Sequence, residues 1–291
     1  MTYESFLQLN TIFISLLIES LPFVLIGVII SGIIQMFVTE EMMAKVIPKN
    51  KFLSVLWAAF LGALFPACEC GIVPIARRLI AKGVPLHAAI PFMLTGPVVN
   101  PVVLFSTYVA FGNDWSMMLN RGGLSFLVAC LVGVILSLQF KDSQVKNDHH
   151  VHGHNHAANF KTKLRGTIKH TIDEFFSVGK FLIIGAFVAA AMQTFVKTST
   201  LLDIGSGEYS STIVMMGLAY VLSLCSEADA FIASSFRSTF SEGSIVAFLV
   251  FGPMFDIKNT LMMLGQFKAR FVLYLFLYVA VFVFIGSILL F

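Results

Sequence analysis

Long apolar runs alternate with short polar breaks along most of the chain, a pattern typical of membrane-spanning helices. A helical crossing needs about 20 apolar residues. The runs predict about eight spans, near residues 9–37, 52–75, 86–111, 121–140, 174–196, 210–226, 243–265 and 269–291. The sequence therefore predicts an all-α, polytopic membrane protein.

The composition agrees with a bilayer environment. The chain has 291 residues, of which 57% are hydrophobic and 12% charged, whereas a soluble domain carries about 25% charged residues. The net charge of +3 is spread over loops and forms no basic stripe, so nucleic acid is not an expected partner. The expected partners are the lipid bilayer and a small solute or ion, and further copies of the chain or a second protein are candidates.

The longest polar stretch divides the chain into a first membrane repeat (1–140), a His-rich polar loop (141–173) and a second membrane repeat (174–291). Residues 27–37 align without gaps on residues 185–195, and residues 91–100 align on residues 247–256. Two matches in the same order indicate an internal duplication. Lys and Arg are somewhat more frequent on the side that holds the central loop, which places that loop and both termini in the cytoplasm and the chain in the cytoplasmic membrane.

Polar residues interrupt two apolar runs at corresponding places in the halves. The first interruption contains Cys68, Glu69 and Cys70 between two prolines, and the second contains Cys225, Glu227 and Asp229. Matched discontinuities in two repeats indicate a transporter's binding site, and a carboxylate within a bilayer costs roughly 2.5 to 3.5 kcal/mol unless it has a partner or water. The alternatives are that the breaks are packing kinks with the carboxylates at the membrane interface, and that the cysteines serve only as small apolar packing residues.

A second matched pair of Gly-Pro breaks precedes Asn100 and Asp256. Unwound turns expose carbonyl groups and helix ends that can bind ions or polar solutes, so both residues are candidates for substrate binding. The alternative is a hinge, with Asp256 and Lys258 near a helix end. Arg77, Arg78 and Lys82 are interpreted as a basic loop beside a span.

The central loop is rich in histidine. Imidazole nitrogens at this density bind divalent metals such as zinc, nickel or copper. No cofactor is required by the sequence, and a divalent or soft metal ion is the candidate ligand. The candidate metal ligands are His149, His150, His152, His154 and His156.

Several motifs resemble those of a bacterial family of predicted permeases, mostly of unknown function, which is related to the organoarsenical efflux permeases. They are Cys68-Glu69-Cys70-Gly71, Pro91 to Pro101, Ser226-Glu227-Ala228-Asp229 and Phe251 to Lys258. The resemblance covers nearly the whole chain and implies about eight spans in two related halves joined by a variable cytoplasmic loop. It supplies no substrate, because the arsenical permeases have a stretch like Cys-Ser-Cys-Gly where this chain has Glu69.

Three functions follow as hypotheses. The leading one is a permease, and not an enzyme, whose central site combines soft ligands from Cys68, Cys70 and Cys225 for a thiophilic metal or metalloid with carboxylates that handle charge or protons. The second is a membrane-embedded thiol redox protein that uses Cys68 and Cys70. The third is a non-transporting, metal-sensing membrane subunit.

Overall fold

The computed structural model describes residues 3–65, 68–140, 144–146, 160–195 and 207–291, and these residues form α-helices and connecting turns. The first part of the chain contains α1 (Tyr3–Phe37), α2 (Glu40–Val46), α3 (Lys51–Leu64), α4 (Glu69–Ala81), α5 (Leu86–Val99), α6 (Pro101–Ala110) and α7 (Trp115–Gln139). The second part contains α8 (Phe160–Phe195), α10 (Glu208–Leu222), α11 (Ser226–Ser235), α12 (Glu242–Met254), α13 (Ile257–Gln266) and α14 (Ala269–Leu290). Val145 and Phe267 form an isolated antiparallel bridge.

Four apolar regions of the described chain are each divided into two helices by a break. The divided pairs are α3 and α4, α5 and α6, α10 and α11, and α12 and α13. Asn100 and Asp256 are extended N-cap residues whose side chains accept from the backbone N–H three residues on, so each ends one helix and begins the next. Ser223 has a φ of 48°, in the left-handed region, which stops α10. The expectation of interrupted helices is confirmed.

The order of a long helix, two interrupted helices and a long helix occurs twice. It runs from α1 to α7 and again from α8 to α14, with the short α2 as an addition after α1. The aligned residues Asn100 and Asp256 hold the same N-cap position, as do Cys68 and Cys225. The division into repeats at 140 and 174 stays a prediction.

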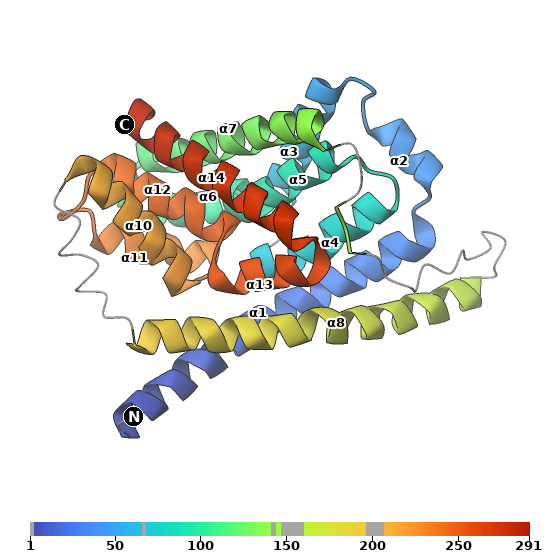
Figure 1. The fold of residues 1–291 in the computed structure, drawn as a ribbon, viewed down its shortest axis with the longest axis horizontal. Coiled ribbons are helices and arrows are strands. Elements are labelled where there is room, and N and C mark those ends of the chain that lie inside the picture. The colour runs from blue at the N-terminus through green and yellow to red at the C-terminus, as the bar shows by residue number, and fades with distance from the viewer. Residues whose placement is uncertain (1–2, 66–67, 141–143, 147–159, 196–206) are drawn as a thin grey trace.

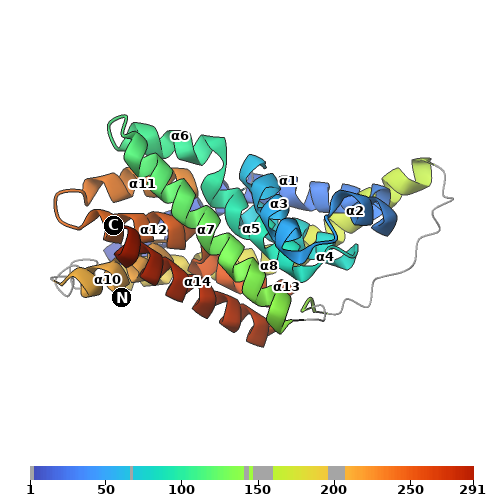
Figure 2. The ribbon, with the colours of Figure 1, turned by 90° about the horizontal axis from the view of Figure 1, so that it is seen from above.

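The long helices α1 and α8 pack against each other along one side of the molecule, and α7 and α14 cover the opposite side (Figure 1). The interrupted helices lie between these two pairs of long helices (Figure 1). Seen from above, α7 and α14 run diagonally across the molecule (Figure 2). Helix α12 is buried along nearly its whole length, and α4 and α5 are mostly buried. The core therefore centres on these three helices.

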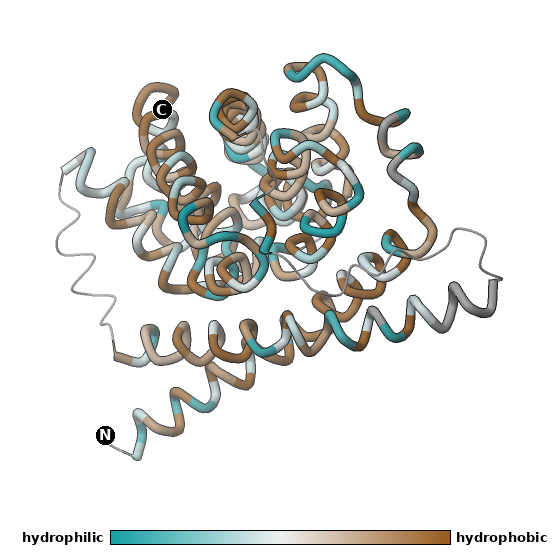
Figure 3. The backbone as a smooth tube through the Cα atoms, turned by 45° about the vertical axis from the view of Figure 1, so that its right-hand side comes forward, coloured by the Kyte–Doolittle hydropathy of each residue, from teal (hydrophilic) through white to brown (hydrophobic). Residues whose placement is uncertain are grey.

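Apolar residues predominate along the long helices (Figure 3). Many of their large side chains are exposed, among them Ile26 and Ile29 on α1, Phe187 on α8, and Leu277 and Val281 on α14. A continuous apolar surface of this kind needs a nonaqueous solvent. Six segments of the described chain are long and apolar enough to cross a membrane, and α3 and most of α10 are shorter apolar helices. A polytopic all-α membrane protein is confirmed, whereas the number of eight spans stays a prediction.

The described helices differ from the predicted span ends and loops at three places. Helix α8 begins at Phe160, inside the predicted loop 141–173, because charged residues lower hydropathy without preventing a helix. Arg77 and Arg78 lie on α4 and not in a loop. The predicted span 210–226 ends earlier, at Leu222, and a separate helix begins at Ser226.

Candidate functional site

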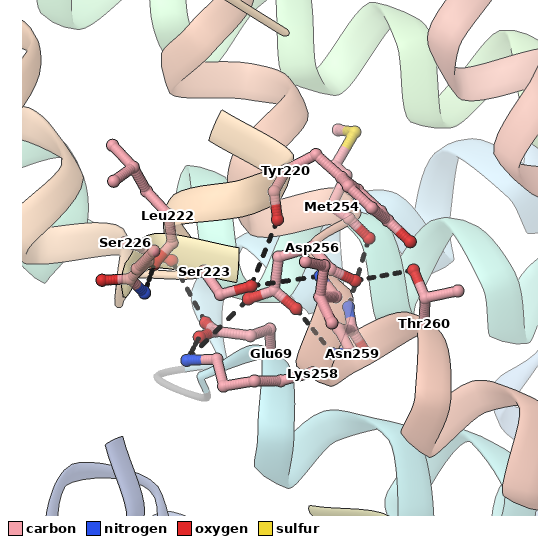
Figure 4. Close-up of polar contacts among 12 residues, drawn as sticks. Glu69, Tyr220, Leu222, Ser223, Ser226, Met254, Asp256, Lys258, Asn259 and Thr260 are labelled. Atoms are coloured by element: carbon pink, nitrogen blue, oxygen red, sulfur yellow. Dashed lines mark hydrogen bonds and ion pairs between the residues drawn. The ribbon is translucent and has the colours of Figure 1, made fainter. Parts of the chain in front are cut away.

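Three of the four helix breaks meet inside the molecule (Figure 4). The Ser226 hydroxyl, at the start of α11, donates to Glu69 Oε2 at the start of α4 over 3.4 Å. The Ser223 hydroxyl, in the same break, accepts from the backbone N–H of Ile257 at the start of α13 over 3.1 Å. The starts of α4 and α13 are thus both hydrogen-bonded to the break between α10 and α11, although the three segments are far apart in the sequence.

The Lys258 cluster, defined as Glu69, Asp256 and Lys258, occupies this meeting point. Lys258 Nζ lies 3.9 Å from Glu69 Oε1 and 3.8 Å from Asp256 Oδ2. These residues are only 2%, 1% and 1% exposed, so both carboxylates are inside the protein. Both distances exceed the roughly 2.7–2.9 Å of a charge-assisted hydrogen bond, so the ammonium is shared between the two carboxylates.

The two oxygens of Asp256 have different environments. Oδ1 accepts from the backbone N–H of Asn259 over 2.6 Å, whereas Oδ2 faces Lys258 and has no hydrogen-bond partner among the described residues. The amide oxygen of Asn259 is also buried without a hydrogen-bond partner there, while its nitrogen donates to the Met254 carbonyl over 3.2 Å. The start of α13 therefore presents two buried oxygens that the described protein atoms leave without a donor.

A second buried cation, Arg121 on α7, reaches the same region. Its Nη1 donates to the Thr107 hydroxyl on α6 over 2.7 Å, and its Nη2 donates to the Ser226 carbonyl over 3.0 Å. Arg121 is fully buried. Asp229 Oδ2 has no hydrogen-bond partner within the described chain and lies against Gly252, where an added Cβ would come within 3.1 Å of it.

The cysteines lie around this charged region. Cys68 and Cys70 flank Glu69, and Cys68 is the N-cap residue of α4. Cys225 holds the corresponding N-cap position of α11. All four cysteines are free thiols.

The predicted site residues thus divide into two groups. Glu69, Asp229 and Asp256 are buried at or beside the Lys258 cluster, with Cys68, Cys70 and Cys225 adjacent, while Glu227 is half-buried. Asn100 differs from these, because its Nδ2 donates to the Gly96 carbonyl over 2.9 Å and its Oδ1 accepts from Val103 N over 3.0 Å. Backbone groups of neighbouring residues in the chain therefore fix the Asn100 side chain.

No group of three or more His, Cys, Asp or Glu side chains within the described ranges is arranged to hold a metal ion. The predicted metal ligands His149, His150, His152, His154 and His156 lie outside the described residues.

A separate buried ion cluster, the Glu174 cluster, joins α1, α4 and α8. Glu174 Oε2 accepts from Ser31 Oγ over 2.6 Å and from Arg78 Nη2 over 2.9 Å, and Oε1 lies 3.7 Å from Arg77 Nη1. Lys82 Nζ donates to the Gln35 carbonyl over 2.7 Å. The interpretation as a loop is therefore wrong for Arg77 and Arg78, which lie on α4 against a buried carboxylate, whereas Lys82 does lie in the turn that follows α4.

Sequence reasoning did not select Arg121, Ser223, Ser226 or Glu174 as site residues. An arginine and a glutamate inside or beside an apolar run are visible signals of a buried ion pair. Their partners lie too far along the chain to be identified from spacing.

Interrupted helices that meet at a buried charged site, inside a bundle with an apolar exterior, define a polytopic helical membrane permease. The chain belongs to the family described as predicted permease (ArsP_1), whose model matches residues 5–290.

Two relatives are similar over almost their full length. The UPF0718 protein YcgR of Bacillus subtilis (strain 168) is 67% identical over 98% of both chains. A protein of Streptococcus mutans named a putative two-component membrane permease complex subunit is 44% identical over 93% of this chain and 90% of its own. The UPF0718 protein MJ0584 of Methanocaldococcus jannaschii is 25% identical over 48% of this chain and 38% of its own. No solved structure matches the chain.

Proposed function

We propose that this permease moves a small solute across the cytoplasmic membrane along a path that passes the meeting point of its helix breaks. The observation that carries the proposal is the position of the Lys258 cluster. It is buried within the bundle, and breaks from both parts of the chain surround it. Buried charges at membrane depth are costly and mark solute or ion pathways.

The helix ends explain why such a site can bind a solute. Glu69 and Asp256 lie at the N-terminal ends of α4 and α13, where backbone N–H groups have no intrahelical acceptor. Those ends favour negative charge, while the preceding ends expose carbonyl oxygens. A polar solute at the breaks therefore finds both donors and acceptors.

The thiols favour a thiophilic substrate, a metal ion or a metalloid. Cys68 and Cys70 flank Glu69 in the sequence, Cys68 and Cys225 are the N-cap residues of α4 and α11, and thiolates are soft ligands. In this proposal the carboxylates balance charge or take up coupled ions while the thiols bind the solute. Thermal shift of the purified chain with zinc, copper(I) and trivalent arsenicals tests the substrate class, with Cys68→Ser, Cys70→Ser and Cys225→Ser as variants. A stabilisation that all three variants retain would exclude a thiol site.

The name of the Streptococcus mutans relative supports a further part of the proposal, that the chain acts together with a second protein. The permease would then be one subunit of a membrane complex, with both termini and the central loop in the cytoplasm.

Accessibility of the native cysteines tests the permease function without knowledge of the substrate. A permease exposes its central site to one side of the membrane and then to the other. Cys225, at the break between α10 and α11, should therefore react with a membrane-impermeant maleimide both in intact cells and in inside-out vesicles. The variant for labelling carries Cys68→Ser, Cys70→Ser and Cys130→Ser.

The matched control keeps only Cys130, a half-buried residue in the middle of α7. It should not react with the impermeant reagent from either side. Labelling of Cys225 from one side only, under all conditions, would contradict alternating exposure. It would favour a non-transporting subunit.

A further inference from the structure

We propose that Glu69, Asp256 and Asn259 form a site for a small, singly charged coupling cation, and that the Lys258 ammonium occupies this site in the present conformation. The inference rests on the proposed transport function and adds the ion that accompanies the solute. In this view Lys258 is a tethered substitute that keeps the carboxylates neutralised while the coupling ion is absent.

The first argument for a cation site is that several carboxylate and amide oxygens lie near Lys258. Asp256 Oδ2 and Asn259 Oδ1 are buried and have no hydrogen-bond partner within the described chain, and Glu69 Oε1 faces the same Lys258 ammonium as Asp256 Oδ2. Carboxylate and amide oxygens are the ligands that hard cations prefer. The Lys258 ammonium lies 3.8–3.9 Å from both carboxylates and so interacts with them mainly through its charge.

Charge balance carries the second step. Removing one partner from a buried ion pair leaves an uncompensated charge and is strongly destabilising. The Lys258 side chain can therefore leave the carboxylates readily only when another cation replaces it. The replacement carries one charge, because the exchange then leaves the net charge of the buried site unchanged.

The internal repeat supports the pairing of Lys258 with Asp256. In the alignment of residues 91–100 on residues 247–256, Asp256 corresponds to Asn100, and the same register places Lys258 opposite Val102. The acid and the lysine are both present in the second part of the chain, and neither is present in the first. This pattern is expected if the lysine serves the carboxylate.

Cation-dependent thermal unfolding of the purified, full-length chain tests the inference. The buffer contains choline as its only bulk cation, and sodium, potassium or ammonium chloride is titrated in. A cation that binds the folded state raises the melting temperature. The melting temperature of Lys258→Met should rise at a cation concentration at least about tenfold lower than the concentration that the wild type needs. The double variants Lys258→Met/Glu69→Gln and Lys258→Met/Asp256→Asn should lose this gain.

Lys82→Met is the matched control, because it removes a lysine that lies outside the site and donates to the Gln35 carbonyl. Its cation response should equal that of the wild type. Lys258→Gln, which keeps a polar side chain, provides the same test if Lys258→Met does not fold. Equal cation responses in the wild type and in both Lys258 variants would overturn the inference, as would a response to magnesium alone. If Cys225 is labelled from both sides but no cation changes the melting temperature of the Lys258 variants, the proposed permease function stands and only the cation site is excluded.

Discussion

The Arg121 guanidinium donates to the Ser226 backbone carbonyl over 3.0 Å and so fastens α7 to the break between α10 and α11. The same side chain donates to the Thr107 hydroxyl of α6. One buried cation therefore holds three elements around the charged site.

We expect Arg121→Met to lower the free energy of unfolding by about 1.5–3 kcal/mol for each hydrogen bond of the buried cation that is lost, the one to Thr107 and the one to the Ser226 carbonyl. Titration with sodium dodecyl sulfate in mixed micelles measures this free energy. The control is Arg237→Met, since the Arg237 side chain is 58% exposed where it pairs with Asp114. Loss of an exposed pair should cost about 0–1 kcal/mol. Equal effects of the two substitutions would contradict the role given to Arg121.

Close packing of α1 on α4 gives a second prediction. An added Cβ at Gly27 would lie 2.4 Å from the Gly71 carbonyl oxygen, so Gly27→Ala must push α1 away from the helix that begins at Glu69. Overpacking of this kind costs about 1–3 kcal/mol, which would appear as a lower melting temperature. At Gly123 on α7 an added Cβ meets no atom within 4 Å. Gly123→Ala should therefore leave stability unchanged or raise it by up to about 1 kcal/mol.

The helix breaks and the buried acids could be predicted from the sequence because their signals are local. Proline, glycine and a carboxylate inside an apolar run, as around Glu69, cannot belong to a straight lipid-facing helix. The roles of Asn100 and Asp256 could not be separated in this way, since both follow a Gly-Pro break. Only the contacts in the folded structure distinguish them. The Asn100 side chain is hydrogen-bonded to a backbone carbonyl, whereas the Asp256 side chain faces Lys258.

The ion pairs could not be predicted, because a single sequence does not specify which distant residues meet. Arg78 and Glu174 lie 96 positions apart, and Ser31 and Glu174 lie 143 apart. The beginning of α8 was missed for another reason. Hydropathy reports where a helix enters the apolar layer and not where the helix begins.

The Glu174 cluster gives a third prediction. Glu174→Gln removes the negative charge that faces Arg77 and Arg78 and should lower the free energy of unfolding by about 1.5–3 kcal/mol, the range for a hydrogen bond to a charged group. A double-mutant cycle with Arg78→Met measures the direct interaction. We expect a coupling energy of about 0.5–3 kcal/mol, and additive effects would show that the two side chains do not stabilise each other.

Asn100 distinguishes a capping role from contact with the solute. Its side chain accepts from Val103 N and donates to the Gly96 carbonyl, so Asn100→Ala should destabilise the chain by about 0.5–2 kcal/mol through loss of the N-cap. Asn100→Ser retains a capping oxygen and should recover most of this loss in the melting temperature. If Asn100 also contacts the solute, both variants should lose the thermal shift produced by that solute, because the Ser hydroxyl is shorter and has no amide donor. If its role is capping alone, Asn100→Ser should keep the full thermal shift, and the solute contacts would lie on the Glu69 and Asp256 side of the breaks.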